Sequence, residues 1–179
     1  MYQYCIELLK NKNIRCEKGL SEAEIEKVYK TYNITFPVCY ENFLKEILPV
    51  SDAVYNWRDF SGTNVKYIKE SMRQPFDDIE EMSSEVYWCD EWGEEPDEAQ
   101  RIVIIRERLK KAPKLIPIYH HRYMPIIDSD NPPVLSIHGV DVIYYGKNLE
   151  DYIQNEFGSG RRTLFLNQYK YVPFWSDIM

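Results

Sequence analysis

The sequence predicts an α+β domain, built from helices first, then a meander of antiparallel strands, then a closing helix packed against the sheet. Apolar residues recur at helical spacing in the first part of the chain. Between residues 115 and 145 they instead form short runs cut by turn residues, which is typical of strands. The 179 residues suit one domain, which we place at 1–157, followed by a tail at 158–179.

The N-terminal part is predicted to contain three helices. Residues 1–12 form the first. The second begins at Ser21, because Ser21 as N-cap and Glu24 at the third helical position form a capping box. Pro37 closes an extended link, and a third amphipathic helix follows until Pro49.

The middle of the chain is less regular. Residues 53–60 are predicted to form a short strand, and residues 64–72 a short helix. No period holds from 75 to 93, so we expect a loop there, with a helical turn that places Trp88 and Trp92 on one face. Pro96, followed by two acids, indicates the start of a helix that ends at Lys110 and Lys111.

The C-terminal half is predicted to hold the sheet, with strands at 115–119, 123–127, 134–137 and 142–145. Their short connections favour antiparallel neighbours. A helix over 149–157 closes the domain. The tail is too apolar for a free end, so we expect it to dock on its own domain, or alternatively to join a second subunit in a homo-oligomer. Its apolar residues are Leu164, Phe165, Leu166, Tyr169, Tyr171, Val172, Phe174, Trp175 and Ile178.

Acidic residues are concentrated in one segment, from Asp77 to Glu98, within an insertion that we place at about 75–98. The segment holds 11 of the 29 acidic residues and no Lys or Arg. Without those 11, the chain would have 18 acidic against 22 basic residues, so its net charge of −7 would become +4. The acidity of this protein is therefore local.

Large rings lie among these acids, and aromatic side chains flanked by carboxylates suit a surface that binds something basic. The alternative is a solvated face or a mobile loop. The candidate contact residues are Tyr87, Trp88, Asp90, Glu91, Trp92, Glu94 and Glu95. Arg122 is a candidate structural clamp, which would pair with Asp90 or Glu91 and stack on the tryptophans.

Composition and motifs argue against several other functions. A pI near 5.1 disfavours direct nucleic-acid binding, which needs clustered Lys and Arg. No secretion signal or membrane-length apolar run is visible, and the four cysteines form no Cys-x-x-Cys pair, so we expect a cytoplasmic protein with reduced cysteines.

Residues that could perform chemistry are few. His120, His121 and His138 with Asp128 lack the spacing of a metal site, because adjacent histidines on a strand point to opposite faces. Cys89 lies near acidic residues, and negatively charged neighbours make a thiol a poor nucleophile. No phosphate-binding glycine loop or serine elbow is present. We expect no enzyme, metal or cofactor. An enzyme built around His121, Arg122 and His138 is an open alternative.

Several short motifs, in order along the chain, resemble the SUKH superfamily, the Smi/Knr family of bacterial immunity proteins and fungal cell-wall regulators. They are Gly19-Leu20-Ser21-Glu22-Ala23-Glu24-Ile25, Phe36-Pro37-Val38-Cys39-Tyr40-Glu41-Asn42-Phe43-Leu44, Leu115-Ile116-Pro117-Ile118, and Asp141-Val142-Ile143-Tyr144-Tyr145-Gly146 with Asn148-Leu149 and Tyr152. The sequence departs from the family pattern at residues 119–123, in the acidic insertion and in the tail.

The resemblance implies an α+β domain with helices on one side of its sheet, no cofactor and no catalytic residues. It also implies an immunity protein, which would bind and neutralise a cognate toxin, often a nuclease. The acidic segment with its aromatic rings adds that the chain would do so by masking a basic surface. A regulatory or scaffold module of the same fold, with no toxin partner, is the alternative.

Overall fold

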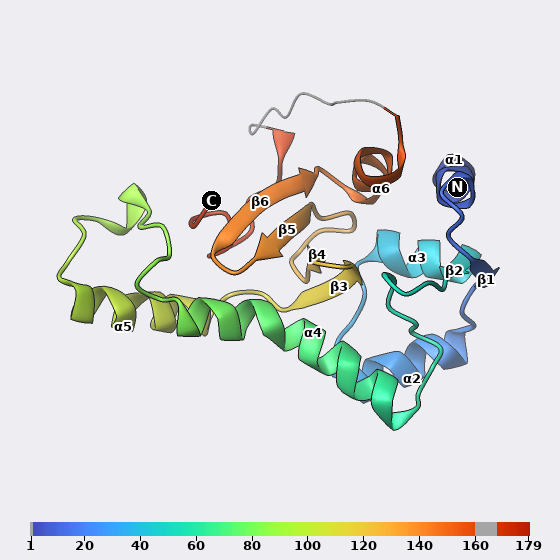
Figure 1. Ribbon diagram of the computed structural model, residues 1–179, viewed down its shortest axis with the longest axis horizontal. Coiled ribbons are helices and arrows are strands. Elements are labelled where there is room, and N and C mark those ends of the chain that lie inside the picture. The colour runs from blue at the N-terminus through green and yellow to red at the C-terminus, as the bar shows by residue number, and fades with distance from the viewer. Residues whose placement is uncertain (1, 160–167) are drawn as a thin grey trace.

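The computed structural model describes residues 2–159 and 168–179, and it contains helices on both sides of an antiparallel sheet (Figure 1). The helices are α1 (Gln3–Asn11), α2 (Glu22–Tyr32), α3 (Val38–Glu46), α4 (Gly62–Glu81), the short 3-10 helix η1 (Asp90–Trp92), α5 (Glu98–Leu109) and α6 (Leu149–Phe157). The strands are β1 (Cys16–Lys18), β2 (Ile47–Pro49), β3 (Leu115–Tyr119), β4 (Arg122–Pro125), β5 (Val134–His138) and β6 (Asp141–Gly146).

The predicted α+β class is confirmed. Strands β3 to β6 form one antiparallel sheet in chain order, and β1 and β2 form a separate antiparallel pair. Helix α2 begins with the predicted capping box: the Ser21 hydroxyl accepts the Glu24 amide, and the Glu24 carboxylate accepts the Ser21 amide at 2.8 Å. Helix α3 begins directly after Pro37, as predicted.

The four-stranded sheet is covered on both faces, which differs from the one-sided arrangement that the resemblance implies. Ile116, Met124 and Val134 face a core shared with α1, α2, α3 and α6. Leu115 and Leu135, their neighbours in the strands, face a second core shared with the later part of α4, with α5 and with the tail. Both sets of alternating side chains are apolar, so neither face can be left in water.

Helix α4 is much longer than the predicted helix over 64–72. It continues through Pro75 to Glu81, although proline lacks the amide proton that a helix interior uses. Packing outweighs this cost, because Ile79 is completely buried and Phe76 packs beside it in the second core. The segment at 53–60 also differs from prediction, since it forms turns with one isolated bridge, between Val54 and Tyr119.

The described part of the tail packs on its own chain. Val172, Phe174, Trp175 and Ile178 are buried in the second core. The Trp175 ring meets the Phe76 ring edge to face, with 5.2 Å between centroids. Of the tail residues singled out in the sequence, Leu164, Phe165 and Leu166 lie outside the described residues.

Candidate functional site

The acidic segment 77–98 is divided among three elements instead of forming one loop. Its first five residues are the last turns of α4, its middle contains η1, and its last residue opens α5. Asp97 caps α5, because its carboxylate accepts the Gln100 amide at 2.9 Å. Asp97 and Glu98 therefore have the structural role at a helix start that the sequence predicts.

Arg101 fastens the middle of this segment to α5, a role that the sequence analysis missed. Its guanidinium donates to the carbonyls of Ser83 and Ser84, both at 2.9 Å, and to that of Val86. It also pairs with Glu95, and only 11% of its side chain is exposed. An arginine fork with this many acceptors holds a loop strongly. The available signal was that Arg101 is the first basic residue after 11 acids.

The two tryptophans of the segment are also structural. Trp88 is only 8% exposed, and its indole nitrogen donates to the Gly93 carbonyl at 2.8 Å. Trp92 meets Trp88 edge to face, stacks on Phe174 of the tail, and lies under the Arg108 guanidinium at 4.4 Å. These rings join the acidic segment to the second core, so Trp88 cannot offer its ring to a partner.

The structure therefore separates the predicted contact residues into two groups. Trp88, Trp92 and Glu95 are engaged within the chain. Tyr87 is 53% exposed, and the other three side chains are exposed acids that make no hydrogen bond or ion pair with the described residues. Those three are Asp90, Glu91 and Glu94.

Seven of the 11 acids in the segment make no side-chain hydrogen bond or ion pair with the described residues. The other four are engaged: Asp77 with Arg73, Asp78 with Gln74, Glu95 with Arg101, and Asp97 as the cap of α5. The seven are Glu80, Glu81, Glu85, Asp90, Glu91, Glu94 and Glu98. All seven are exposed. We call these seven carboxylates, together with Tyr87, the acidic surface.

Arg122 is a clamp, but the expected partners in the acidic segment were wrong. Its guanidinium donates to the Glu156 carboxylate at 2.9 Å and to the Ser136 hydroxyl at 2.8 Å, and it lies 3.9 Å from the centre of the Tyr145 ring. Arg122 shares its sheet face with Met124, which faces α6, whereas the acidic segment packs beyond the opposite face. The alternation of side chains along β4 decides its partners.

The three histidines are placed differently from expectation. His120 and His121 form the turn between β3 and β4, with His120 at a φ of 44°, so the alternation assumed for a strand does not apply. The His121 and His138 rings lie 5.8 Å apart. Arg122 is occupied at α6 and does not join them. Within residues 2–159 and 168–179, no group of three or more His, Cys, Asp or Glu side chains could hold a metal ion.

These two histidines line a cavity of about 600 Å³ between α4 and the ends of the two hairpins. Its polar lining residues are Gln74, Asp78, His121, Tyr123, His138 and Asp141. We call it the hairpin cavity. Burial, with help from Arg122 and His138, lowers the pKa of His121, which favours its neutral form. Sequence reasoning found the histidines but not Tyr123 or Asp78, because only the fold brings α4 to the hairpin ends.

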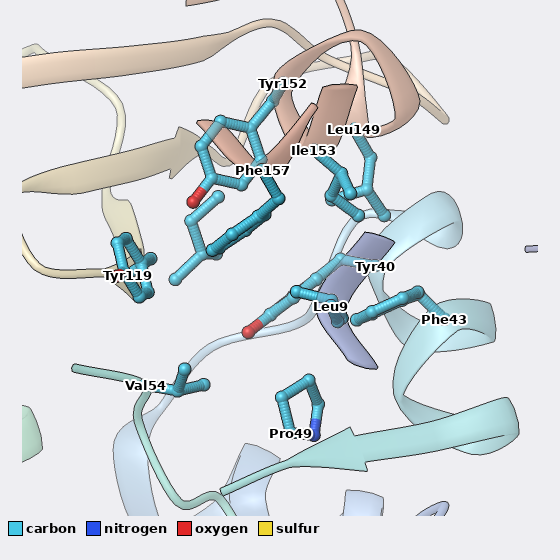
Figure 2. Close-up of a pocket in the computed structure, with 11 residues that line it drawn as sticks. Leu9, Tyr40, Phe43, Pro49, Val54, Tyr119, Leu149, Tyr152, Ile153 and Phe157 are labelled. Carbon is cyan, nitrogen blue, oxygen red and sulfur yellow. The ribbon is translucent and has the colours of Figure 1, made fainter. Parts of the chain in front are cut away.

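A smaller cavity of about 30 Å³ lies on the other side of the sheet, between α6 and the N-terminal elements (Figure 2). Its walls are almost wholly apolar, with contributions from Leu9, Phe43 and Phe157. The Tyr152 hydroxyl beside it has no hydrogen-bond partner among the described residues.

Comparison with protein-family models, with curated proteins and with solved structures gives no match. The resemblance to the SUKH superfamily therefore stays a prediction. In the described part of the chain, every helix is too short or too polar to cross a membrane.

Proposed function

We propose that this chain is a non-enzymatic protein-binding domain whose acidic surface covers a basic surface on a partner protein. The observation that carries the proposal is the set of seven exposed carboxylates that make no hydrogen bond or ion pair with the described residues, on a frame held by Arg101 and by the two tryptophans. Exposed carboxylates close together give a local negative potential, which attracts a basic partner.

The frame matters because a rigid surface loses little conformational freedom when it binds. Arg101 fixes three carbonyls of the segment, and Trp88 and Trp92 fix its middle against α5 and the tail. A partner would therefore meet carboxylates already in place, which lowers the entropic cost of association. Tyr87, 53% exposed beside them, supplies an aromatic contact.

The more specific form of the proposal is an immunity protein in the cytoplasm, which neutralises a toxin such as a nuclease. Nucleases hold phosphates with basic residues, so a carboxylate-rich surface would steer association and block access to the active site. The motif resemblance to the SUKH superfamily supports this form.

The test uses the product of an adjacent gene as the candidate toxin. We expect tight binding, with an association rate that falls as salt rises. Replacing Glu85, Asp90, Glu91 and Glu94 together by their amides should slow association at least tenfold, on the order expected for lost steering, and flatten the salt dependence.

A matched control neutralises four exposed acids elsewhere, namely Glu7, Glu26, Asp52 and Glu70. It changes the net charge by the same amount, so it separates a local surface from an effect of total charge. An association rate that is equal in both variants would show that the acidic surface is not the contact.

A further inference from the structure

The hairpin cavity is negatively charged. Asp78 from α4 and Asp141 at the start of β6 line it, and none of the described residues that line it is Lys or Arg. His121 adds no positive charge at neutral pH, because its pKa is lowered. The cavity of about 600 Å³ is also within the range of small-ligand sites. A cation is therefore the ligand that its charge favours.

Tyr123 gives an independent indication of a ligand. Its side chain is only 4% exposed and lines the cavity, yet its hydroxyl makes no hydrogen bond with the described residues. The hydroxyl opens to the cavity, where a ligand can reach it. Burial raises the pKa of Tyr123, so the phenol stays protonated and can still accept a hydrogen bond from a ligand.

Apolar groups occupy the rest of the cavity wall. Met82, Ile137 and Val140 line it together with the polar residues. Such a wall suits the methylene stem of a long basic side chain, while carboxylates and a phenol suit its charged end.

We propose that the hairpin cavity binds the cationic head of a lysine or arginine side chain presented by a basic partner protein. The cavity adjoins the acidic surface along α4, since Asp78 lines the cavity and Glu81, three positions later, is its neighbour on the helix surface. A partner lying on the acidic surface could thus anchor one side chain beside it. This inference rests on the proposed function for its source of the cation, but its ligand chemistry can be tested alone.

The test is an NMR titration of the full chain with N-acetyl-arginine amide and N-acetyl-lysine amide. N-acetyl-citrulline amide, which has the shape of the arginine compound without its charge, is the matched control ligand. We expect saturable shifts of the Gly139 and Val140 amides, with a dissociation constant on the order of 1 mM for one side chain. Replacing Asp78 by Asn should weaken binding about tenfold, as loss of a charged partner does.

Two further variants and one control variant keep the result interpretable. Asp141→Asn, at an exposed position, repeats the loss of charge without touching α4. Tyr123→Phe removes only the hydroxyl and should weaken binding several-fold. Glu7→Gln with Asp52→Asn, at exposed positions outside the cavity lining and the acidic surface, removes the charge of two other acids and should leave the titration unchanged.

Three outcomes would overturn the proposal: an equal response to the citrulline compound, shifts that persist in both aspartate variants, or much tighter binding of free spermidine, which would assign the cavity to a soluble polyamine. Failure of the proposed function looks different. In that case the arginine compound binds the cavity, but neutralising the acidic surface leaves partner association unchanged.

Discussion

Replacing Arg101 by Ala tests whether one side chain holds the acidic segment in place. The change removes three hydrogen bonds to carbonyls and the ion pair with Glu95, at a side chain that is 11% exposed. Hydrogen bonds to a charged group contribute roughly 1.5–3 kcal/mol each, but water can replace the one to exposed Ser84. Ser83 and Val86 are buried. We therefore expect the free energy of unfolding to fall by about 2–4 kcal/mol.

The assay is urea denaturation, followed by far-ultraviolet circular dichroism and by tryptophan fluorescence, to which Trp88 and Trp92 contribute together with Trp57 and Trp175. The control is Arg106→Ala on the same helix, because Arg106 donates one bond of 3.2 Å to the Glu80 carbonyl at an exposed position. That control should change stability by about 0.5 kcal/mol or less. Equal losses in the two variants would refute the assignment of Arg101 as the clamp.

Three further predictions concern other parts of the fold. Arg122→Ala removes one member of a nearly buried ion pair and should lower the free energy of unfolding by about 2–4 kcal/mol in urea denaturation; an unchanged midpoint would contradict its clamping role. Glu24 has its pKa lowered to about 2, chiefly by Arg58. The folded-state pKa thus lies below the unfolded value near 4.5, so this stability is present above that value and is lost as pH falls toward 2. The loss is about 1–2 kcal/mol after allowance for solvent screening. Arg58→Ala should reduce this loss in a pH series of denaturation curves, and the part that remains comes from the hydrogen bonds of Ser21. A methyl group on Gly19 would come within 1.9 Å of a carbonyl oxygen at the end of α3, whereas one on Gly62 would meet nothing within 4 Å, so we expect Gly19→Ala to melt well below the wild type and Gly62→Ala to melt near it.

The regular parts of the fold could be predicted because their signals are local. A capping box fixes the start of α2 through residues three positions apart, and alternating apolar runs fix the four strands of the sheet. The course of α4 beyond Pro75 could not be predicted in this way. It depends on Phe76 and Ile79 meeting a second core whose other members come from the sheet and the tail.

The site was predicted only in part for the same reason. Acidity and exposure of Glu91 and Glu94 follow from composition, since a run of acids is seldom buried. The arginine that holds the acidic segment could not be predicted. The choice depends on which face of the sheet the side chains of β4 point to, and on which side of α5 turns toward the segment. Arg122 falls on the α6 side, and Arg101 points at three carbonyls of the preceding loop.

Helix α4 has a consequence for how the protein unfolds. Ile68 belongs to the first core and Ile79 to the second, so a single helix is shared by both. Neither core can come apart without disrupting part of α4, which favours one cooperative transition over two. A partner bound at the C-terminal end of α4 should therefore slow amide hydrogen exchange around Ile68, near the other end of the helix.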